Sequence, residues 1–360
     1  MKKTLLATTA LAALGAVAVA GPAMAAEKIK LSVGGYMEQW FGYGSSDVAN
    51  ENDRSGFDQQ SDSEIHFSGK TTLDNGLTVG VNVQLEGESQ KNADNTKSDE
   101  IDEAYLFVQS SLGEFGLGSE NGPAYKMHFG LASHGAGIDE GDGPAWIAGL
   151  NSALNRSSTS AGIDNDNNKI WYISPRVQGI QVGASYAPND AQDSDSAPNG
   201  SDGNRDDQFS VAANLIQTFG DVKVMLSAGY HDAGDDDDLA AKSDIESIST
   251  GMRLGFGGFS VNGVYSEFEN EVTNLDRTVY GAGVTYAAGP MAVSLNWLAG
   301  EDDVNGNEEQ QDLFELGLSY TLGPGIQARG SFFYGENDDG DAGTAEADGM
   351  AIVGGLKIGF

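Results

Sequence analysis

The sequence predicts an all-β fold, an antiparallel up-and-down β-barrel of about sixteen strands. Three observations predict it: apolar and polar residues alternate in short segments, the links between the segments are alternately short and long, and the polar face of the segments carries charges. In the segment 77–86 (LTVGVNVQLE), every odd position is apolar and every even position is polar or glycine. This is the period of a strand with one apolar face.

The same alternation recurs to the end of the chain. A tight turn at Asp74-Asn75-Gly76 joins the first clear pair of segments into a hairpin. The predicted strands are 29–43, 63–73, 77–86, 104–110, 115–119, 169–174, 180–186, 209–219, 222–230, 248–256, 259–268, 277–286, 291–299, 313–322, 326–334 and 350–360. Their number is even, as single-chain bacterial outer-membrane barrels require.

The links alternate in length. Minimal turns such as 112–113, 220–221 and 257–258 alternate with long links that are mostly acidic. The long links are 44–62, 87–99, 120–168, 187–207, 231–244, 269–276, 300–311 and 335–348. Short turns at one end and long loops at the other are typical of a transmembrane barrel threaded from the periplasm. We therefore expect both termini on the periplasmic side.

The first 25 residues have the three parts of a secretory signal peptide. Lys2 and Lys3 precede an apolar run over 5–20, and Ala23-Met24-Ala25 is a small-residue cleavage site. A membrane helix is the alternative, but the run is short and rich in alanine. We expect residues 1–25 to be removed and residues 26–360 to form one barrel domain of an exported protein.

The composition excludes several classes of protein. The formal net charge is −35, so binding to nucleic acid is excluded by its sign. Cysteine is absent, so no disulfide stabilises the chain. The chain has 50 glycines and only 8 prolines, which suits a large sheet with tight turns better than a disordered linker.

The two faces of the strands indicate a membrane barrel. The apolar face carries aromatic residues near strand ends, at Phe256, Phe259, Tyr280, Tyr286, Trp297, Tyr320, Phe332, Tyr334 and Phe360. Such belts mark the two membrane interfaces. The polar face carries Glu64, Lys70, Glu86, Glu103, Lys223, Arg253, Arg277, Glu315, Arg329 and Lys357. Because these charges require water, we expect them to line a lumen and not the dry core of a sandwich.

The third long link, 120–168, differs from the others. Its middle reads KMHFGLASHGAGIDEGDGPAWIAGL, with Asp139, Glu140 and Asp142 among glycines and small apolar residues. An apolar loop of this length would be costly to expose, so we expect it to fold into the lumen, where its carboxylates narrow the channel. The alternative is an ordinary exposed acidic loop.

The chain resembles the general diffusion porins of Gram-negative bacteria. The resemblance is carried by KLSVGGYMEQWFGYG at the start, LFVQSSLGEFGLGSENGP before the third long link and GMAIVGGLKIGF at the end. It covers essentially all of residues 26–360 and implies a sixteen-stranded homotrimer whose third loop forms a constriction. The resemblance implies an acidic side at Asp139, Glu140 and Asp142, and assembly by the barrel-assembly machinery through Phe360.

The basic side of such a constriction is spread along the strands. The inward basic residues are Lys70, Arg253, Arg277 and Arg329. They do not form the arginine cluster that the resemblance implies. Each residue therefore fits a wall charge paired with a carboxylate as well as it fits the constriction.

A loose calcium-loop pattern occurs near the end of the chain. Glu301, Asp303, Asn305 and Asp312 have roughly the spacing, but the pattern lacks the closing glutamate and flanking helices. We favour a solvated loop tip and expect no metal or other cofactor. A weaker alternative is that divalent ions bridge the acidic loops to lipopolysaccharide.

Motifs of catalysis are absent from the sequence. It contains no HExxH pair, no GxSxG elbow and no phosphate-binding GxxxxGK[ST]. We expect no enzyme but a diffusion channel of the outer membrane for ions and small hydrophilic solutes, with a preference for cations. The alternatives are a substrate-specific channel, for example for sugars, and a secreted calcium-binding adhesin without a pore.

Overall fold

A computed structural model describes twelve stretches of the chain. They are residues 28–49, 54–87, 101–139, 144–148, 150, 159–163, 166–189, 206–234, 245–271, 273–304, 306–338 and 346–360. The predicted signal peptide 1–25 lies outside the described residues.

Sixteen strands make up the described fold. They are β1 (Ser32–Val48), β2 (Arg54–Thr72), β3 (Thr78–Glu86), β4 (Ile101–Ser110), β5 (Gly113–Ser119), β6 (Asn168–Ile173), β7 (Ile180–Asn189), β8 (Asp206–Phe219), β9 (Val222–Gly234), β10 (Ile245–Phe256), β11 (Phe259–Asn270), β12 (Leu275–Ala288), β13 (Met291–Val304), β14 (Asn307–Gly323), β15 (Ile326–Asp338) and β16 (Ala347–Gly359). Each strand overlaps one of the sixteen predicted segments, so the predicted order and number are confirmed.

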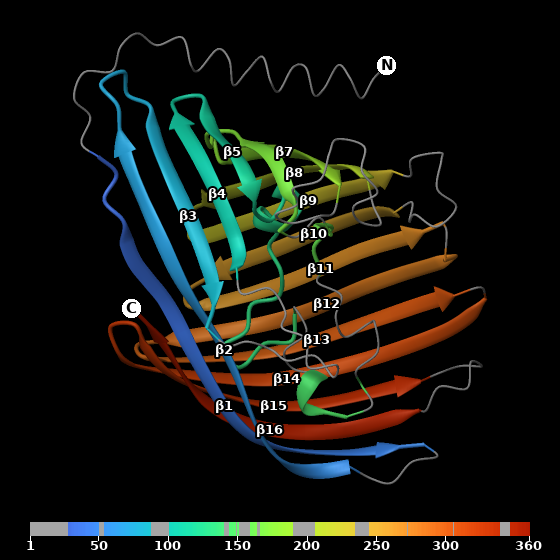
Figure 1. Cartoon of the computed structure of the whole chain (residues 1–360). Helices are drawn as coiled ribbons and strands as arrows, with labels where there is room; N and C mark the ends of the chain where they lie inside the picture. The colour runs from blue at the N-terminus through green and yellow to red at the C-terminus, as the bar shows by residue number, and fades with distance from the viewer. Residues whose placement is uncertain are drawn as a thin grey trace.

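The strands form one closed antiparallel barrel. Each strand pairs with its neighbours in sequence, and β16 pairs with β1 to close the sheet (Figure 1). The last backbone bonds of the closure join Gly35 and Phe360 in both directions, at 3.0 and 3.1 Å. Closure satisfies the edge groups that an open sheet would expose to lipid. The closed barrel excludes the sandwich fold of the secreted-adhesin alternative.

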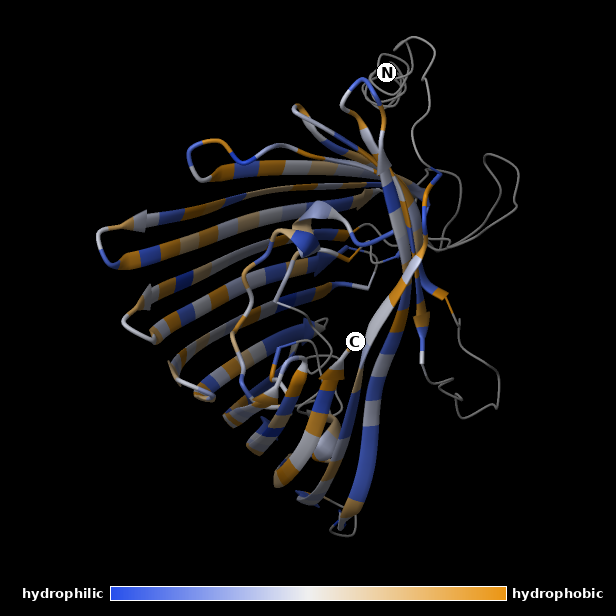
Figure 2. Cartoon of the chain, turned by 90° about the vertical axis from the view of Figure 1, so that its left-hand side faces the viewer, coloured by the Kyte–Doolittle hydropathy of each residue, from blue (hydrophilic) through white to orange (hydrophobic). Residues whose placement is uncertain are grey.

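The two faces of the barrel differ as the alternation predicts. On β14, Phe314, Leu316 and Leu318 are 41–51% exposed, whereas the alternate residues Leu313 and Glu315 are each at most 1% exposed. Figure 2 shows apolar and polar bands alternating along the strands. Large apolar side chains on the outside of so many strands match a surface that contacts hydrocarbon.

Several long links are shorter than predicted, because the strands continue past their apolar stretch. β1 extends to Val48 and β2 starts at Arg54, inside the predicted link 44–62. β13 and β14 likewise reach Val304 and Asn307, inside the predicted link 300–311. The apolar alternation ends there, but backbone pairing in water needs no apolar face, so the ladder goes on.

The minimal turns are as predicted. Gly257 and Gly258 connect β10 to β11 with φ of 55° and 90°. A two-residue hairpin turn with two positive φ angles matches the twist of the strands and favours glycine at both positions.

Helix is scarce in the described residues. The helix α2 (Pro123–Lys126) and the short 3₁₀ helix η1 (Pro144–Trp146) both belong to the link between β5 and β6. Among the residues that the structure describes, no helix is long and apolar enough to cross a membrane.

Candidate constriction inside the barrel

The link between β5 and β6, residues 120–167, is here called the inner loop. Its described parts lie against the inner wall of the barrel, where Figures 1 and 2 show them on the concave side of the sheet. Near the start of the loop, α2 contacts β7 and β8. Further along the loop, η1 contacts β1 on the opposite wall of the barrel. The described parts of the inner loop therefore contact opposite walls of the lumen.

The first part of the loop is held by β8. Ser210 Oγ accepts a 3.0 Å hydrogen bond from the N–H of Ala124, and Asn214 Nδ2 donates a 3.0 Å bond to the carbonyl of Met127. Both wall residues are inward-facing and buried. Small polar side chains on the wall thus replace the backbone partners that a loop lacks.

The middle of the loop, residues 132–137, is bound by three neighbouring strands, β13 to β15. The N–H groups of His134, Ala136 and Gly137 donate to Ser294 Oγ, Ser331 Oγ and Glu315 Oε1 at 2.9, 2.7 and 3.0 Å. Asn296 Nδ2 donates to the carbonyl of Ala132 at 3.1 Å. We call Ser294, Asn296, Glu315 and Ser331 the docking site of the inner loop.

Glu315 is the charged member of this docking site and is fully buried. Its carboxylate accepts bonds from Gly137 N, Ser331 Oγ at 2.8 Å and Asn296 Nδ2 at 3.2 Å. A buried carboxylate is stable only when such donors replace its water. The backbone N–H of the loop therefore helps to stabilise the buried charge of Glu315.

Glycines let the loop approach the wall closely. A Cβ on Gly135 would lie 1.9 Å from Ser331 Oγ and 2.9 Å from Gly317 Cα. A Cβ on Gly317 would lie 2.5 Å from the N of Gly135. Neither position accommodates a side chain while the loop is docked.

The far end of the loop packs on β1 and β16. Trp146 and Ile147 are 6% and 1% exposed and belong to one apolar cluster with Trp40 and Val353 of the wall. A Cβ on Gly44 would lie 2.2 Å from the carbonyl oxygen of Trp146. This apolar contact anchors the loop on the wall opposite to α2.

Asp139 is the one predicted constriction acid that lies in a described stretch. Its carboxylate accepts bonds from Leu131 N at 2.9 Å and from Thr159 N and Oγ1 at 3.2 and 2.8 Å. Asp139 therefore joins three distant parts of the inner loop to one another. Glu140 and Asp142 lie outside the described residues.

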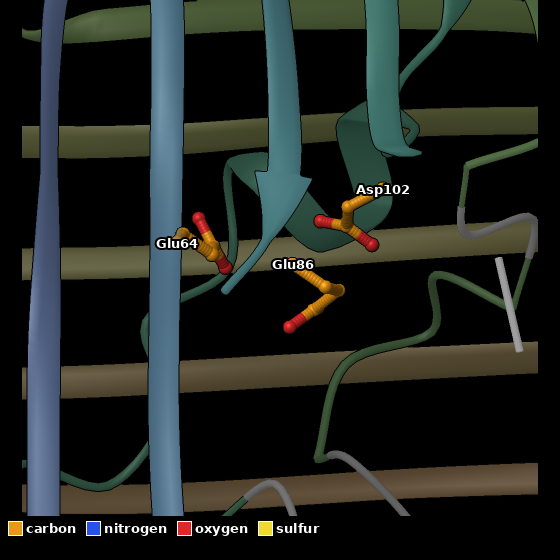
Figure 3. A group of neighbouring side chains, drawn as sticks. All are labelled: Glu64, Glu86 and Asp102. Atoms are coloured by element: carbon orange, nitrogen blue, oxygen red, sulfur yellow. The ribbon is translucent and has the colours of Figure 1, made fainter. Parts of the chain in front are cut away.

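A group of carboxylates lies on β2 to β4 and on the adjoining end of the inner loop. One carboxylate oxygen each from Glu64, Glu86 and Asp102 lie within 4.8 Å of one another, and the same holds for Asp102, Glu103 and Asp166. Figure 3 shows the first three side chains on neighbouring strands. We call these five residues the lumen acid group.

Local sequence pattern identifies only part of this group. Glu64, Glu86 and Glu103 lie on the predicted polar face, but Asp102 is next to Glu103 and would point to the other face of a regular strand. The register shifts between Gln84 and Leu85, which pair with Glu103 and Ile101. This bulge leaves Asp102 as the extra residue and brings it beside Glu103.

The comparisons with known proteins agree with this architecture. A family model described as Gram-negative porin matches residues 7–340. The chain belongs to the Gram-negative porin family. The family is one of outer-membrane channel proteins and not of enzymes. No curated protein sequence matches the porin.

Solved structures share the fold at low sequence identity. The anion-selective porin from Comamonas acidovorans has a TM-score of 0.61 and 16% identity, with 92% of this porin and 100% of that chain covered. The trimer form of OmpT from Vibrio cholerae has a TM-score of 0.59 and 15% identity, covering 93% and 100%. A porin refined at 1.8 Å has a TM-score of 0.56 and 18% identity, covering 92% and 100%.

Two of the four predicted basic residues of the porin are held by separate partners. Arg253 donates two bonds to the carbonyl of Gly130, at 2.6 and 2.9 Å. Arg277 forms a two-point ion pair with Asp302, at 2.6 and 2.7 Å.

The other two basic residues differ in their surroundings. Arg329 lies 3.3 Å from Glu38, which also pairs with Lys357. Lys70 is exposed on β2. The four residues therefore do not gather into one cluster, and Arg253 is the one that holds the inner loop.

The weak calcium candidates of the porin are spread over two strands. Glu301 and Asp303 lie on β13 and Asp312 lies on β14, while Asn305 is outside the described residues. Asp312 accepts a bond from Trp297 Nε1 at 2.5 Å, and Asp303 accepts one from Gly306 N at 2.6 Å. Among the described residues, the acidic groups compact enough to hold a cation are the two inside the lumen acid group.

Proposed function

We propose that the porin is a water-filled channel for the passive diffusion of ions and small hydrophilic solutes, and that it prefers cations to anions. The lumen acid group carries the preference, because four carboxylates of the wall and Asp166 of the inner loop lie close together. Among the inward basic residues, Arg253 is held by the inner loop, while Arg277 and Arg329 are paired with carboxylates. A wall with excess negative charge concentrates cations in the pore.

The reversal potential in a planar bilayer under a salt gradient tests this preference. Wild-type porin is expected to pass cations more readily than anions. The triple variant Glu64→Gln, Glu86→Gln, Asp102→Asn is expected to lower the cation-to-anion permeability ratio. The matched control Asp74→Asn, Asp221→Asn, Asp276→Asn removes as many carboxylates from turns and strand ends and is expected to leave the ratio unchanged. Anion preference of the wild type would contradict the proposal.

A channel specific for sugars has weaker support. Tyr105 lies next to Phe107 and Trp171 on the inner wall, with ring centroids 6.5 and 5.3 Å apart. Trp171 is only 1% exposed, and the Lys126 ammonium lies over its ring at 5.2 Å. These aromatic rings therefore do not form a row of exposed faces along which a sugar could stack. Their arrangement favours general diffusion over a sugar-specific channel.

We further propose that the porin is a homotrimer whose subunits meet through β1 and β2. One of the similar solved structures, OmpT of Vibrio cholerae, is described as a trimer form. On the outer face, Gln59 Nε2 donates to Gln39 Oε1 at 3.0 Å, beside the stacked rings of Phe41 and Phe57. Amide groups are costly in hydrocarbon and are better accommodated at a protein contact. The double variant Gln39→Leu, Gln59→Leu is expected to weaken the oligomer in detergent, measured by light scattering.

We also propose that the short turns and both termini face the periplasm. The long loops would then face the lipopolysaccharide, and Phe360 would be presented to the barrel-assembly machinery. An epitope tag in the link 339–345 is expected to bind antibody on intact cells. A tag at Gly257-Gly258 is expected to bind only after the outer membrane is opened. The opposite labelling would overturn the orientation.

A further inference from the structure

A cavity of about 560 Å³ lies between the first part of the inner loop and the wall, beside the short β4–β5 and β6–β7 turns. This volume is in the range of small-molecule sites, about 300–1,000 Å³. The cavity is separate from the docking site at β13 to β15 and from the lumen acid group, since none of their residues lines it.

One wall of the cavity carries a buried hydrogen-bond acceptor without a partner. Asn214 is 7% exposed, and its Nδ2 is used by the carbonyl of Met127. Its Oδ1 is buried and has no hydrogen-bond partner. This oxygen exposes almost no surface to the cavity, so a ligand N–H group would reach it only if the Asn214 side chain turned.

Two opposite charges line the same cavity. The Glu114 carboxylate is oriented by Gln109 Nε2 at 2.6 Å and Trp171 Nε1 at 3.4 Å, and it has further lone pairs. The Arg176 guanidinium donates to Gly179 O and Gln181 Oε1, both at 2.7 Å, and has further N–H groups. The cavity can therefore receive a cationic and an anionic group together.

The remaining lining is largely apolar. Met127 and Phe129 come from the loop, and Ile173 and Ile216 from the wall. Lys126 also lines the cavity, but its ammonium pairs with Glu120 at 2.8 Å. The charge of Lys126 is thus compensated, and the apolar side chains are available to a hydrophobic body.

We propose that this cavity binds apolar α-amino acids as zwitterions. The ammonium group contacts Glu114, the carboxylate contacts Arg176, and the side chain packs on Phe129 and Ile216. This inference rests on the proposed channel function, because the solute reaches the cavity through the lumen. The cavity would add a saturable binding site to a channel that otherwise lets solutes diffuse through without binding them.

The test is single-channel recording in planar bilayers with L-phenylalanine added on the short-turn side. Reversible current blocks that saturate with concentration are expected. Phenethylamine lacks the carboxylate and hydrocinnamate lacks the ammonium, so each is expected to bind about ten-fold more weakly, as loss of one charged hydrogen bond implies. Calorimetry with detergent-solubilised porin gives the same comparison independently of current.

Variants assign the contacts. Glu114→Gln and Arg176→Gln are each expected to raise the half-saturating phenylalanine concentration about ten-fold. Lys223→Gln is the control and is expected to leave it unchanged. Conductance without solute verifies that each variant is a folded channel, so the proposed function and this inference are tested separately.

Two results would overturn the assignment. Open channels without saturable block or calorimetric binding would show that the cavity retains no amino acid. Equal binding of phenylalanine and phenethylamine, unchanged by Arg176→Gln, would show that the site takes amines and not zwitterions.

Discussion

The N–H of Gly137 donates a 3.0 Å hydrogen bond to Oε1 of Glu315, which ties the inner loop to a fully buried carboxylate on β14. Hydrogen bonds to a charged group contribute about 1.5–3 kcal/mol. In the Glu315→Gln variant the charge is lost while the shape is kept. We expect looser docking of the loop, seen as larger fluctuations of single-channel current. A variant as quiet as the wild type would show that the charge does not hold the loop.

The close approach of Gly135 to Gly317 gives a steric test of the docked state. A Cβ at position 135 would lie 1.9 Å from Ser331 Oγ and 2.6 Å from Glu315 Oε1. Gly135→Ala is therefore expected to displace the loop and alter conductance. The control Gly56→Ala meets no atom within 4 Å and is expected to behave as the wild type. Equal conductance of the two variants would contradict the docked geometry.

The hydrogen bonds of Asp139 suggest a structural role, which can be tested separately from an effect of its charge on permeation. Asp139→Asn weakens its bonds to Leu131 and Thr159, so we expect a lower thermal unfolding midpoint and altered current fluctuations. Glu86→Gln is expected to change cation preference and leave the unfolding midpoint nearly unchanged. Asp139→Asn that changes only the reversal potential would favour a charge role instead.

His128 of the inner loop predicts a pH dependence. Burial lowers the pKa of His128 below 6.5, and Arg253 acts in the same direction, while Asp139 opposes them. A base with a lowered pKa in the folded state stabilises the fold fully above its unfolded pKa. That stability is lost as the pH falls through 6.5 towards the folded pKa.

The corresponding measurement is the unfolding midpoint in detergent between about pH 7.5 and about pH 5.5. The wild type is expected to lose stability on acidification. In His128→Gln this loss is expected to be smaller, since the glutamine amide can still bond Thr159 Oγ1 but does not titrate. An identical pH dependence in both proteins would remove His128 as its source.

The backbone closure at Phe360 predicts an assembly defect. Phe360 and Gly35 exchange both backbone hydrogen bonds at the seam between β16 and β1. Deletion of Phe360 removes this pair together with the terminal aromatic side chain, which is 66% exposed on the outer surface. We expect less assembled porin in outer-membrane fractions, measured against the Leu356→Phe control, which keeps the terminal residue.

The number of strands, their order, their two faces and the ends that carry short turns all follow from the amino-acid pattern alone. These features depend on residues that are close together in the chain, since a period of two is set by the backbone of each strand. The sequence also singled out the third long link by its length and apolar content. The sequence pattern overestimated the length of several links, because strand pairing continues where the apolar pattern stops.

The contacts of the inner loop and the pairing of the charges depend instead on the closed barrel. Glu315 appears in the sequence as one inward charge among many, and closure of the barrel places it against Gly137, 178 residues away. Asp102 joins the lumen acid group because one bulge shifts the register of β3 and β4. Arg277 and Arg329 pair with Asp302 and Glu38 across the sheet. Such contacts depend on register and closure, which join residues far apart in the chain, so the local pattern does not encode them.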